Sequence, residues 1–90
     1  MAEFEHNSEK FGYLNLEDFA HVQKALNDLG YDAGTADGLD GPNTQKAVRE
    51  FQASASIGID GIVGPETRAA LVQRLDQEAN PPETPEEQTS

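Results

Sequence analysis

An eight-residue segment occurs twice in this chain and constrains its fold more than any other feature. Residues 37–44 read DGLDGPNT, and residues 60–67, 23 positions later, read DGIVGPET. Aspartate followed by glycine is typical of a tight turn, because glycine takes positive φ at little cost. Proline suits the first position of a helix, since its φ is already helical and its missing N–H is not needed there. Each copy therefore predicts a turn that leads directly into a helix.

The residues after each proline have the spacing of an amphipathic helix. We expect one helix through PNTQKAVREFQA, residues 42–53, and another through PETRAALVQRL, residues 65–75. The residues predicted on the inner faces are Thr44, Ala47, Val48 and Phe51 in the first helix and Thr67, Ala70, Leu71 and Leu75 in the second. Leu39 and Ile62, at matching positions of the two turns, are expected to point into the core.

An earlier helix is predicted within LNLEDFAHVQKALNDLG, residues 14–30. Its apolar stripe at helical spacing consists of Phe19, Val22, Leu26 and Leu29. Asn15 would cap the start, with Asp18 bonding back to it, and Gly30 would supply the left-handed residue that ends the helix. His21 lies beside the stripe and is expected to be a half-exposed helical residue rather than a base or a ligand.

The glycine before each proline leaves the start of the helix without a side-chain cap. Gly41 and Gly64 fall at the N-cap position and offer no oxygen to the free amides of the first turn. We therefore expect Asp37 and Asp60 to fold back over the helix starts, where a carboxylate also complements the dipole. The residues assigned to the turns and helix starts are Asp37, Gly38, Gly41, Thr44, Asp60, Gly61, Gly64 and Thr67.

The two ends of the chain differ in composition from its middle. Residues 76–90 hold five acids, three prolines and one apolar residue, so they are predicted to be a disordered tail or a linker. Residues 1–13 are polar and irregular and are predicted to be a flexible flank that is partly ordered at best, although Phe4, Phe11 and Tyr13 could lie against the domain. Residues 14–75 are left as the folded domain, and the fold class that we predict is all-α, a compact three-helix bundle.

Charge and composition exclude several classes of function. Seventeen acidic residues against six basic ones give a net charge of −11, which argues against nucleic acid or an anionic membrane as partner. The N-terminus lacks the basic and apolar regions of a secretory signal, and no stretch is apolar enough to cross a membrane. There is no cysteine, and two separated histidines predict no zinc site. The acidic loop DAGTADGLDG places too few carboxylates at calcium-binding positions, so no metal or cofactor is expected.

These motifs carry a resemblance to a known family. Residues 22–71 read VQKALNDLGYDAGTADGLDGPNTQKAVREFQASASIGIDGIVGPETRAAL. This segment resembles the peptidoglycan-binding domain-like family, the small helical modules attached to bacterial and phage cell-wall hydrolases. The matching features are Leu26, Leu29, Gly30 and Tyr31, both Asp-Gly turns, Thr44 and Thr67, and the run AVREFQ that ends at Phe51 and Gln52.

The resemblance implies a monomeric three-helix module that binds peptidoglycan and does not catalyse a reaction. It implies a fused or associated cell-wall hydrolase or delivery protein, and a periplasmic or cell-wall location. The sequence itself agrees with the absence of catalysis, because no Ser-His-Asp motif is recognisable and about 60 residues offer little room for an enclosed substrate cleft.

Four residues are candidates for contact with such a ligand. Tyr31 could stack on a sugar, Arg49 could meet a stem-peptide carboxylate, and Gln45 and Gln52 could bond to amide or hydroxyl groups. Each has a structural alternative. Tyr31 could plug the core, Arg49 could pair with a nearby acid, and Gln52 could cap its own helix.

The chain departs from the family pattern at two places. Ser56, Ile57 and Gly58 stand where the family more often has a glycine and a leucine before the second turn. Asp40 and Val63 stand where an aromatic residue commonly precedes the second glycine of the loop. Because those aromatics are lost and the flanks are acidic, a protein-interaction adaptor that keeps the fold is the alternative function.

Overall fold

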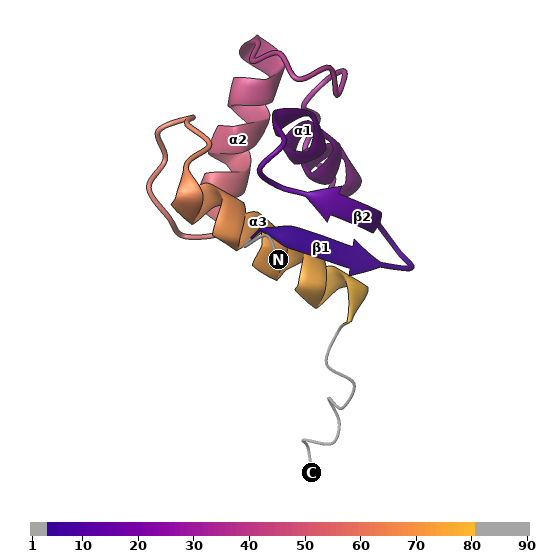
Figure 1. Ribbon diagram of the computed structural model, residues 1–90. Coiled ribbons are helices and arrows are strands. Elements are labelled where there is room, and N and C mark those ends of the chain that lie inside the picture. The colour runs from indigo at the N-terminus through magenta and orange to yellow at the C-terminus, as the bar shows by residue number, and fades with distance from the viewer. Residues whose placement is uncertain (1–3, 81–90) are drawn as a thin grey trace.

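The structure is a computed structural model that describes residues 4–80, in which a short β-hairpin precedes three helices (Figure 1). The strands are β1 (Glu5–Ser8) and β2 (Gly12–Asn15), and the helices are α1 (Phe19–Asp28), α2 (Pro42–Ser54) and α3 (Pro65–Ala79). Helix α1 contacts α2, α3 and β2, and α3 also contacts β1. The fold is therefore helical but not purely all-α, which corrects the predicted fold class.

The hairpin forms where the sequence predicted a flexible flank. The strands are antiparallel, with Glu5 opposite Asn15 and Ser8 opposite Gly12. Gly12 takes a φ of +76°, the left-handed conformation that commonly closes a three-residue hairpin loop. The inward-facing residues of the hairpin and its edges include His6, Phe11, Leu14 and Leu16, all of which are buried. Alternation over so few residues is a weak signal in a polar segment, so residues 5–13 were assigned wrongly.

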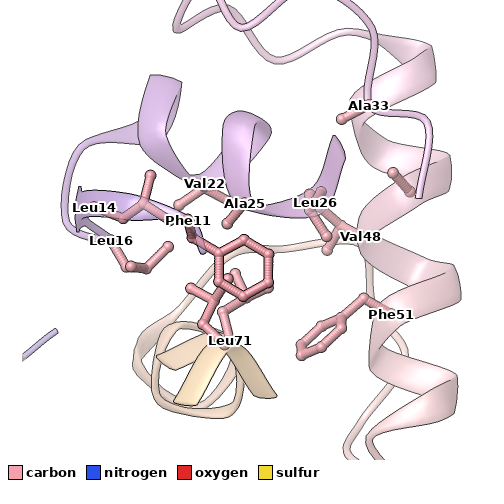
Figure 2. Close-up of a cluster of buried hydrophobic side chains, with 12 residues drawn as sticks. Phe11, Leu14, Leu16, Val22, Ala25, Leu26, Ala33, Val48, Phe51 and Leu71 are labelled. Atoms are coloured by element: carbon pink, nitrogen blue, oxygen red, sulfur yellow. The ribbon is translucent and has the colours of Figure 1, made fainter. Parts of the chain in front are cut away.

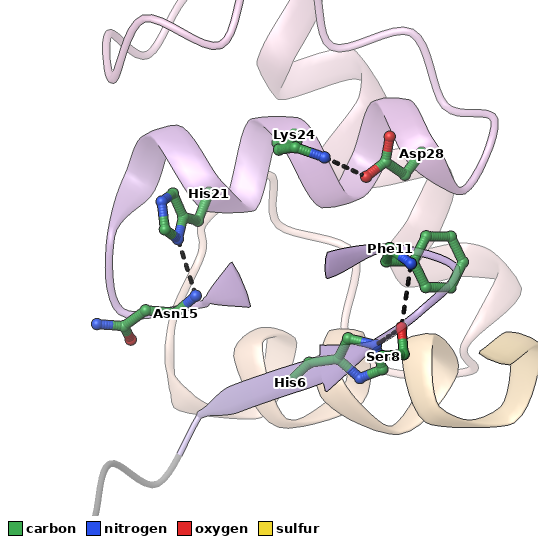
Figure 3. A network of polar contacts seen from close by, with 7 residues as sticks. All are labelled: His6, Ser8, Phe11, Asn15, His21, Lys24 and Asp28. Carbon is green, nitrogen blue, oxygen red and sulfur yellow. Dashed lines mark hydrogen bonds and ion pairs between the residues drawn. The ribbon is translucent and has the colours of Figure 1, made fainter. Parts of the chain in front are cut away.

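Helix α1 begins later than its sequence pattern suggested. Asp18, in an extended conformation, is the N-cap, and its side chain accepts a hydrogen bond from the Ala20 N–H. Asn15 belongs to β2 instead, and its backbone N–H donates to Nδ1 of the half-buried His21 at 2.8 Å (Figure 3). The predicted cap at Asn15 was wrong because the chain is still in β2 at Leu14 and Asn15 and turns at Leu16, and both leucines are buried there.

Helices α2 and α3 begin at the prolines that the repeat indicated. Gly41 and Gly64 are the N-caps, and Pro42 and Pro65 occupy the first helical positions. The predicted inner-face residues Thr44, Ala47, Val48, Phe51, Thr67, Leu71 and Leu75 are buried, and Ala70 is half-buried. Helix α3 runs on to Ala79, so the predicted tail at residues 76–90 begins too early, and its part from residue 81 lies outside the described residues.

One apolar cluster holds the hairpin and the helices together (Figure 2). Its buried members are Phe11, Leu14, Leu16, Val22, Ala25, Leu26, Ala33, Ala47, Val48, Phe51, Leu71 and Leu75. The cluster takes side chains from every helix and from the hairpin. Burial of a large apolar side chain stabilises the folded state by about 1.5–3 kcal/mol, so this cluster is the main source of stability in a chain without disulfides.

A buried histidine fastens the hairpin to the last helix. His6 is 3% exposed, and its ring nitrogens lie 2.7 Å from an Asp76 carboxylate oxygen on α3 and 2.7 Å from the Ser8 hydroxyl oxygen. The same hydroxyl accepts a hydrogen bond from the Phe11 N–H (Figure 3). The sequence showed no Ser-His-Asp motif, yet these three residues meet in space. Because His6 is buried and the Ser8 hydroxyl already accepts a hydrogen bond within its own turn, we interpret the arrangement as structural: it links β1 to α3.

Candidate functional site

Each repeated turn is organised by a glutamine from the preceding helix. In the first turn the carboxamide of Gln23 on α1 is buried, and its oxygen accepts a hydrogen bond from the Gly38 N–H at 2.8 Å. Its nitrogen donates to the Leu39 carbonyl at 2.8 Å and to the Thr44 hydroxyl at 3.0 Å. Thr44 in turn donates to the Ala33 carbonyl. One side chain thus fixes both the turn and the start of α2.

The second turn repeats this arrangement around Gln52 on α2, which is 1% exposed. Its oxygen accepts hydrogen bonds from the Asp60 N–H at 3.1 Å and the Gly61 N–H at 3.0 Å. Its nitrogen donates to the Asp60 carboxylate at 2.9 Å, the Ile62 carbonyl at 3.1 Å and the Thr67 hydroxyl at 3.0 Å. The chain uses one device twice, and we call Gln23 and Gln52 the bracing glutamines.

The aspartates of the turns do not cap the helices as predicted. The Asp37 carboxylate accepts from the Leu39 N–H, and the Asp60 carboxylate accepts from the Ile62 N–H, both at 2.9 Å. No side chain of the described residues caps the start of α2 or α3. A carboxylate bonds readily to a backbone N–H two residues ahead, so each aspartate is used within its own turn and does not reach the helix start.

Asp60 is ionised more readily than an ordinary aspartate. The hydrogen bond from the Ile62 N–H, followed by that from the Gln52 side chain, lowers the pKa of Asp60, because both donors favour its charged form. The negative charge therefore helps to hold the second turn in shape.

Leu39 and Ile62 also differ from expectation, because they face solvent. Leu39 is 70% exposed and Ile62 is 65% exposed. The buried side of each turn is filled by the carboxamide of the bracing glutamine, which leaves the apolar side chain on the outer side. Ile59, just before the second turn, is also exposed. The two turns thus present aliphatic side chains at matching surface positions.

One surface lies where α2 passes the second turn. A Cβ added at Gly61 would lie only 3.2 Å from Nη1 of Arg49, so the exposed Arg49 side chain crosses directly over this glycine. Gln45 lies one helical turn earlier on the same face of α2, and Ile62 follows Gly61 in the chain. We call these four residues the second-turn surface. Within residues 4–80, Arg49 has no carboxylate in ion-pair range.

Tyr31 lies on a different side of α2. Its hydroxyl is 2.8 Å from the Ser54 hydroxyl, and its ring meets the Phe51 ring edge-on at 5.8 Å between centroids. At about 100° per residue, Ser54 and Arg49 point in directions roughly 140° apart around the helix. The structure therefore brings Gln45 and Arg49 together and separates Tyr31 from them.

Gln52 is also removed from the surface, because its carboxamide is buried in the second turn. A ligand could not reach it without breaking the brace. Gln23 has the equivalent role and was missed in the sequence, although each bracing glutamine follows a buried apolar residue, Val22 or Phe51, ahead of an Asp-Gly pair. The sequence reasoning also missed Arg74, which approaches Tyr31 from α3 at 3.4 Å. No local pattern around Arg74 marks this contact.

Comparison with known proteins finds a family that matches the part of the chain containing both turns. Residues 15–71 match the family described as "Putative peptidoglycan binding domain", a span that includes both bracing glutamines and both turns. The chain belongs to the peptidoglycan-binding domain family. The matched span also contains all of the second-turn surface. The resemblance found in the sequence is thereby confirmed.

Two curated relatives share part of this domain. Over 55 residues the chain is 40% identical to the N-acetylmuramoyl-L-alanine amidase CwlM of Mycobacterium tuberculosis, covering 61% of this chain and 14% of that protein. Over 73 residues it is 38% identical to an uncharacterized protein in the bpoA1 3' region of Kitasatospora aureofaciens, covering 76% of this chain and 62% of that protein. The chain thus spans less than two thirds of either relative. No solved structure matches it.

The described part of the chain has neither a cluster of metal-ligand side chains nor a membrane-spanning helix. Among residues 4–80 no three side chains of histidine, cysteine, aspartate or glutamate gather as metal ligands would. No helix in this range combines the length and apolar character that crossing a bilayer requires.

Proposed function

We propose that this chain is a non-catalytic module that attaches a protein or assembly to bacterial cell-wall peptidoglycan. The observation that carries the proposal is the family match over residues 15–71, which coincides with the two braced turns. The bracing glutamines form their hydrogen bonds inside the fold, so they would contribute to binding only by holding the turns at the surface rigid. A rigid receptor loses little conformational entropy on binding.

The second-turn surface is the contact region that we propose. Peptidoglycan offers sugar hydroxyls, amides and stem-peptide carboxylates, so a receptor needs an aliphatic or aromatic platform, polar side chains and a local positive charge. Ile62 supplies an exposed aliphatic surface, Gln45 an amide, and Arg49 a guanidinium without an ion-pair partner among residues 4–80. A carboxylate bound by Arg49 would gain charge-assisted, two-pronged hydrogen bonds.

The module would act by raising the local concentration of a partner at the wall. The relative from Mycobacterium tuberculosis is named as an amidase, and this chain covers only 14% of it, which is consistent with a shared domain outside the catalytic part. We therefore propose a fused or associated cell-wall hydrolase or delivery protein as partner, and a cell-wall location.

A protein-interaction adaptor is the second candidate, and one observation favours it. Leu39, Ile59 and Ile62 are each more than half exposed at or beside the turns, and exposed aliphatic side chains can anchor a polypeptide. In this reading the braced turns would present those side chains to a protein partner.

A sedimentation experiment with purified insoluble peptidoglycan sacculi tests the proposal. The wild-type protein should co-sediment, and Arg49→Gln should do so at least several-fold less, with weaker retention of the wild type at higher salt. Lys46→Gln is the matched control, because Lys46 is an exposed neighbour of Arg49 on α2 that pairs with Glu50 on the same helix. Wild-type protein that stays in the supernatant at every salt concentration would favour the adaptor.

A further inference from the structure

Arg74 is a cation without an acidic partner in a strongly acidic chain. It is half-buried on α3, and no carboxylate among residues 4–80 lies within ion-pair range of its guanidinium. Glu78, one helical turn further along the same face, forms no ion pair with Arg74, and Asp76, which points to another face, is bonded to His6. Arg68, the other half-buried arginine of α3, donates to the backbone carbonyls of Leu16 and Val63, whereas Arg74 lies beside a surface depression.

The guanidinium makes three hydrogen bonds within the fold, none of them to a carboxylate. Its contacts are neutral and long: 3.4 Å to the Tyr31 hydroxyl, 3.4 Å to the Ser54 carbonyl and 3.2 Å to the Ser54 hydroxyl. Charge-assisted bonds from arginine to a carboxylate are about 2.7–2.9 Å. These contacts orient the guanidinium without satisfying it as a carboxylate would.

An aromatic pair fixes the position of this charge. The Arg74 guanidinium lies 5.3 Å from the centre of the Phe51 ring, and the Tyr31 ring meets the same ring from its edge. Phe51 is fully buried in the apolar cluster (Figure 2). The guanidinium of Arg74 therefore packs on a residue of the core. A side chain held in this way has already lost much of the rotamer freedom that binding would otherwise remove.

The guanidinium borders a cavity of about 220 Å³ between the end of α2 and α3. Helix α3 lines it with Ala70, Gln73, Arg74 and Gln77, which lie on one face, and Ile57 and Ser54 line it from the other side. The depression is open to solvent on one side, and its volume is enough for a small amino-acid residue. Ala70 and Ile57 suit a methyl group, while the two glutamines suit a peptide group.

We propose that this Arg74 pocket binds a peptide carboxylate, and that in peptidoglycan the ligand is the terminal carboxylate of a stem peptide ending in alanine. This assignment of the ligand rests on the proposed function. The pocket lies on a different side of α2 from the second-turn surface, so the domain would contact peptidoglycan at two places. Tyr31 then acts at the pocket by orienting Arg74, and does not act beside Arg49.

The test is an NMR titration of the full chain with N-acetyl-D-alanyl-D-alanine and, separately, with its C-terminal amide. The free acid should shift the backbone amides of Gln73 and Gln77, and amidation or Arg74→Gln should weaken binding about tenfold or more, because a charge-assisted pair is lost. Lys46→Gln is the matched control, because it removes an exposed cation of α2 that does not line the pocket, and it should leave this titration unchanged. Equal affinities for the acid and its amide would overturn the proposal.

Two further measurements test the role of the guanidinium and the position of the bound carboxylate. Arg74→Lys keeps the charge but not the planar fork, and should bind with intermediate affinity. It also keeps the test decisive if Arg74→Gln unfolds. An acetylated alanyl-glutamyl-alanine amide carries only a side-chain carboxylate, and tighter binding of this peptide than of the dipeptide would overturn the assignment to a terminal carboxylate.

Failure of this inference is distinguishable from failure of the proposed function. If sacculi bind the wild type and Arg74→Gln equally while the dipeptide causes no shifts, the pocket is not a ligand site and the wall-binding proposal stands. If sacculi do not bind but the dipeptide still binds through Arg74, the pocket is a carboxylate site whose ligand comes from another source, and the assignment to peptidoglycan is overturned.

Discussion

Removal of one bracing glutamine tests the physical reason for the repeat. Gln52 makes five hydrogen-bond contacts in the second turn. Its oxygen accepts two of them, and the two N–H groups of its amide are shared among three acceptors, so they count as four full hydrogen bonds. At about 1 kcal/mol net for each, the sum is about 4 kcal/mol. Some partners lie in an exposed turn and would regain water in a variant. We therefore expect Gln52→Ala to lower the free energy of unfolding by about 3–4 kcal/mol.

That loss is large for a domain of this size. A chain of 90 residues has a total stability of roughly 5–13 kcal/mol. The loss should lower the melting temperature by about 12 °C or more. Urea unfolding followed by circular dichroism measures the free energy, and an unchanged slope shows that the unfolding remains two-state.

The matched control lies on the same helix. Gln45 is half-buried, and its side chain makes no hydrogen bond to the described residues, so Gln45→Ala should change the stability by less than about 1 kcal/mol. Gln23→Ala should resemble Gln52→Ala, because it removes the brace of the first turn. If Gln52→Ala were as mild as Gln45→Ala, the bracing explanation of the repeat would be refuted.

Three further predictions concern the turns and their surroundings. Ser56 has a φ of +61°, so Ser56→Gly should raise the melting temperature, through a gain of about 1 kcal/mol; a lower value would show that its side chain matters more than its backbone. Gly61→Ala and Gly38→Ala should both destabilise, since each glycine has positive φ, but only Gly61→Ala should also reduce sedimentation with sacculi, because its Cβ would displace Arg49. The pKa of Asp60 is lower in the folded state than in the unfolded state, so its charge stabilises the fold. This stabilisation is complete above the pKa of the unfolded state and is lost as pH falls through the pKa of the folded state. Asp60→Asn keeps an acceptor and does not titrate, so urea midpoints of this variant should fall less steeply below about pH 4 than those of the wild type, and equal slopes would exclude this role.

The helix starts and much of the core could be predicted because their signals are local. Pro42 and Pro65 mark the first helical positions, and the 3.6-residue spacing after each identifies the buried face. The hairpin was missed for the opposite reason. Strands of four residues contain only two inward positions each. Burial of the polar residue His6 could not be predicted, because its partner Asp76 lies far along the chain.

In the two turns, the sequence positions of the aspartates and of the apolar residues led to the wrong contacts for both. The free amides after Gly41 and Gly64 suggested that the aspartates would cap the helices, and the apolar residue of each turn was expected inside. The carboxamides of Gln23 and Gln52 fill that inner space instead. This arrangement depends on a residue that lies on the preceding helix, so the turn sequence by itself could not reveal it.

The candidate ligand residues were predicted from their chemical type, which does not determine the side of the domain that a side chain faces. Gln45 and Arg49 share a helix face because they are four residues apart, which the sequence does specify. Tyr31 follows α1 by way of Gly30, and its side depends on how α1 packs against α2. Arg74 became a candidate only after α3 was placed beside Ser54.

Mapping the contact surface on the folded protein tests the central claim most directly. We would titrate the wild-type chain with a soluble muropeptide, a disaccharide that carries its stem peptide, and follow the backbone amides by NMR. We expect saturable shifts at Arg49, Gly61 and Ile62, which Arg49→Gln should weaken and Lys46→Gln should leave unchanged. Saturable shifts confined to other parts of the domain, or no shifts at millimolar muropeptide, would contradict this claim.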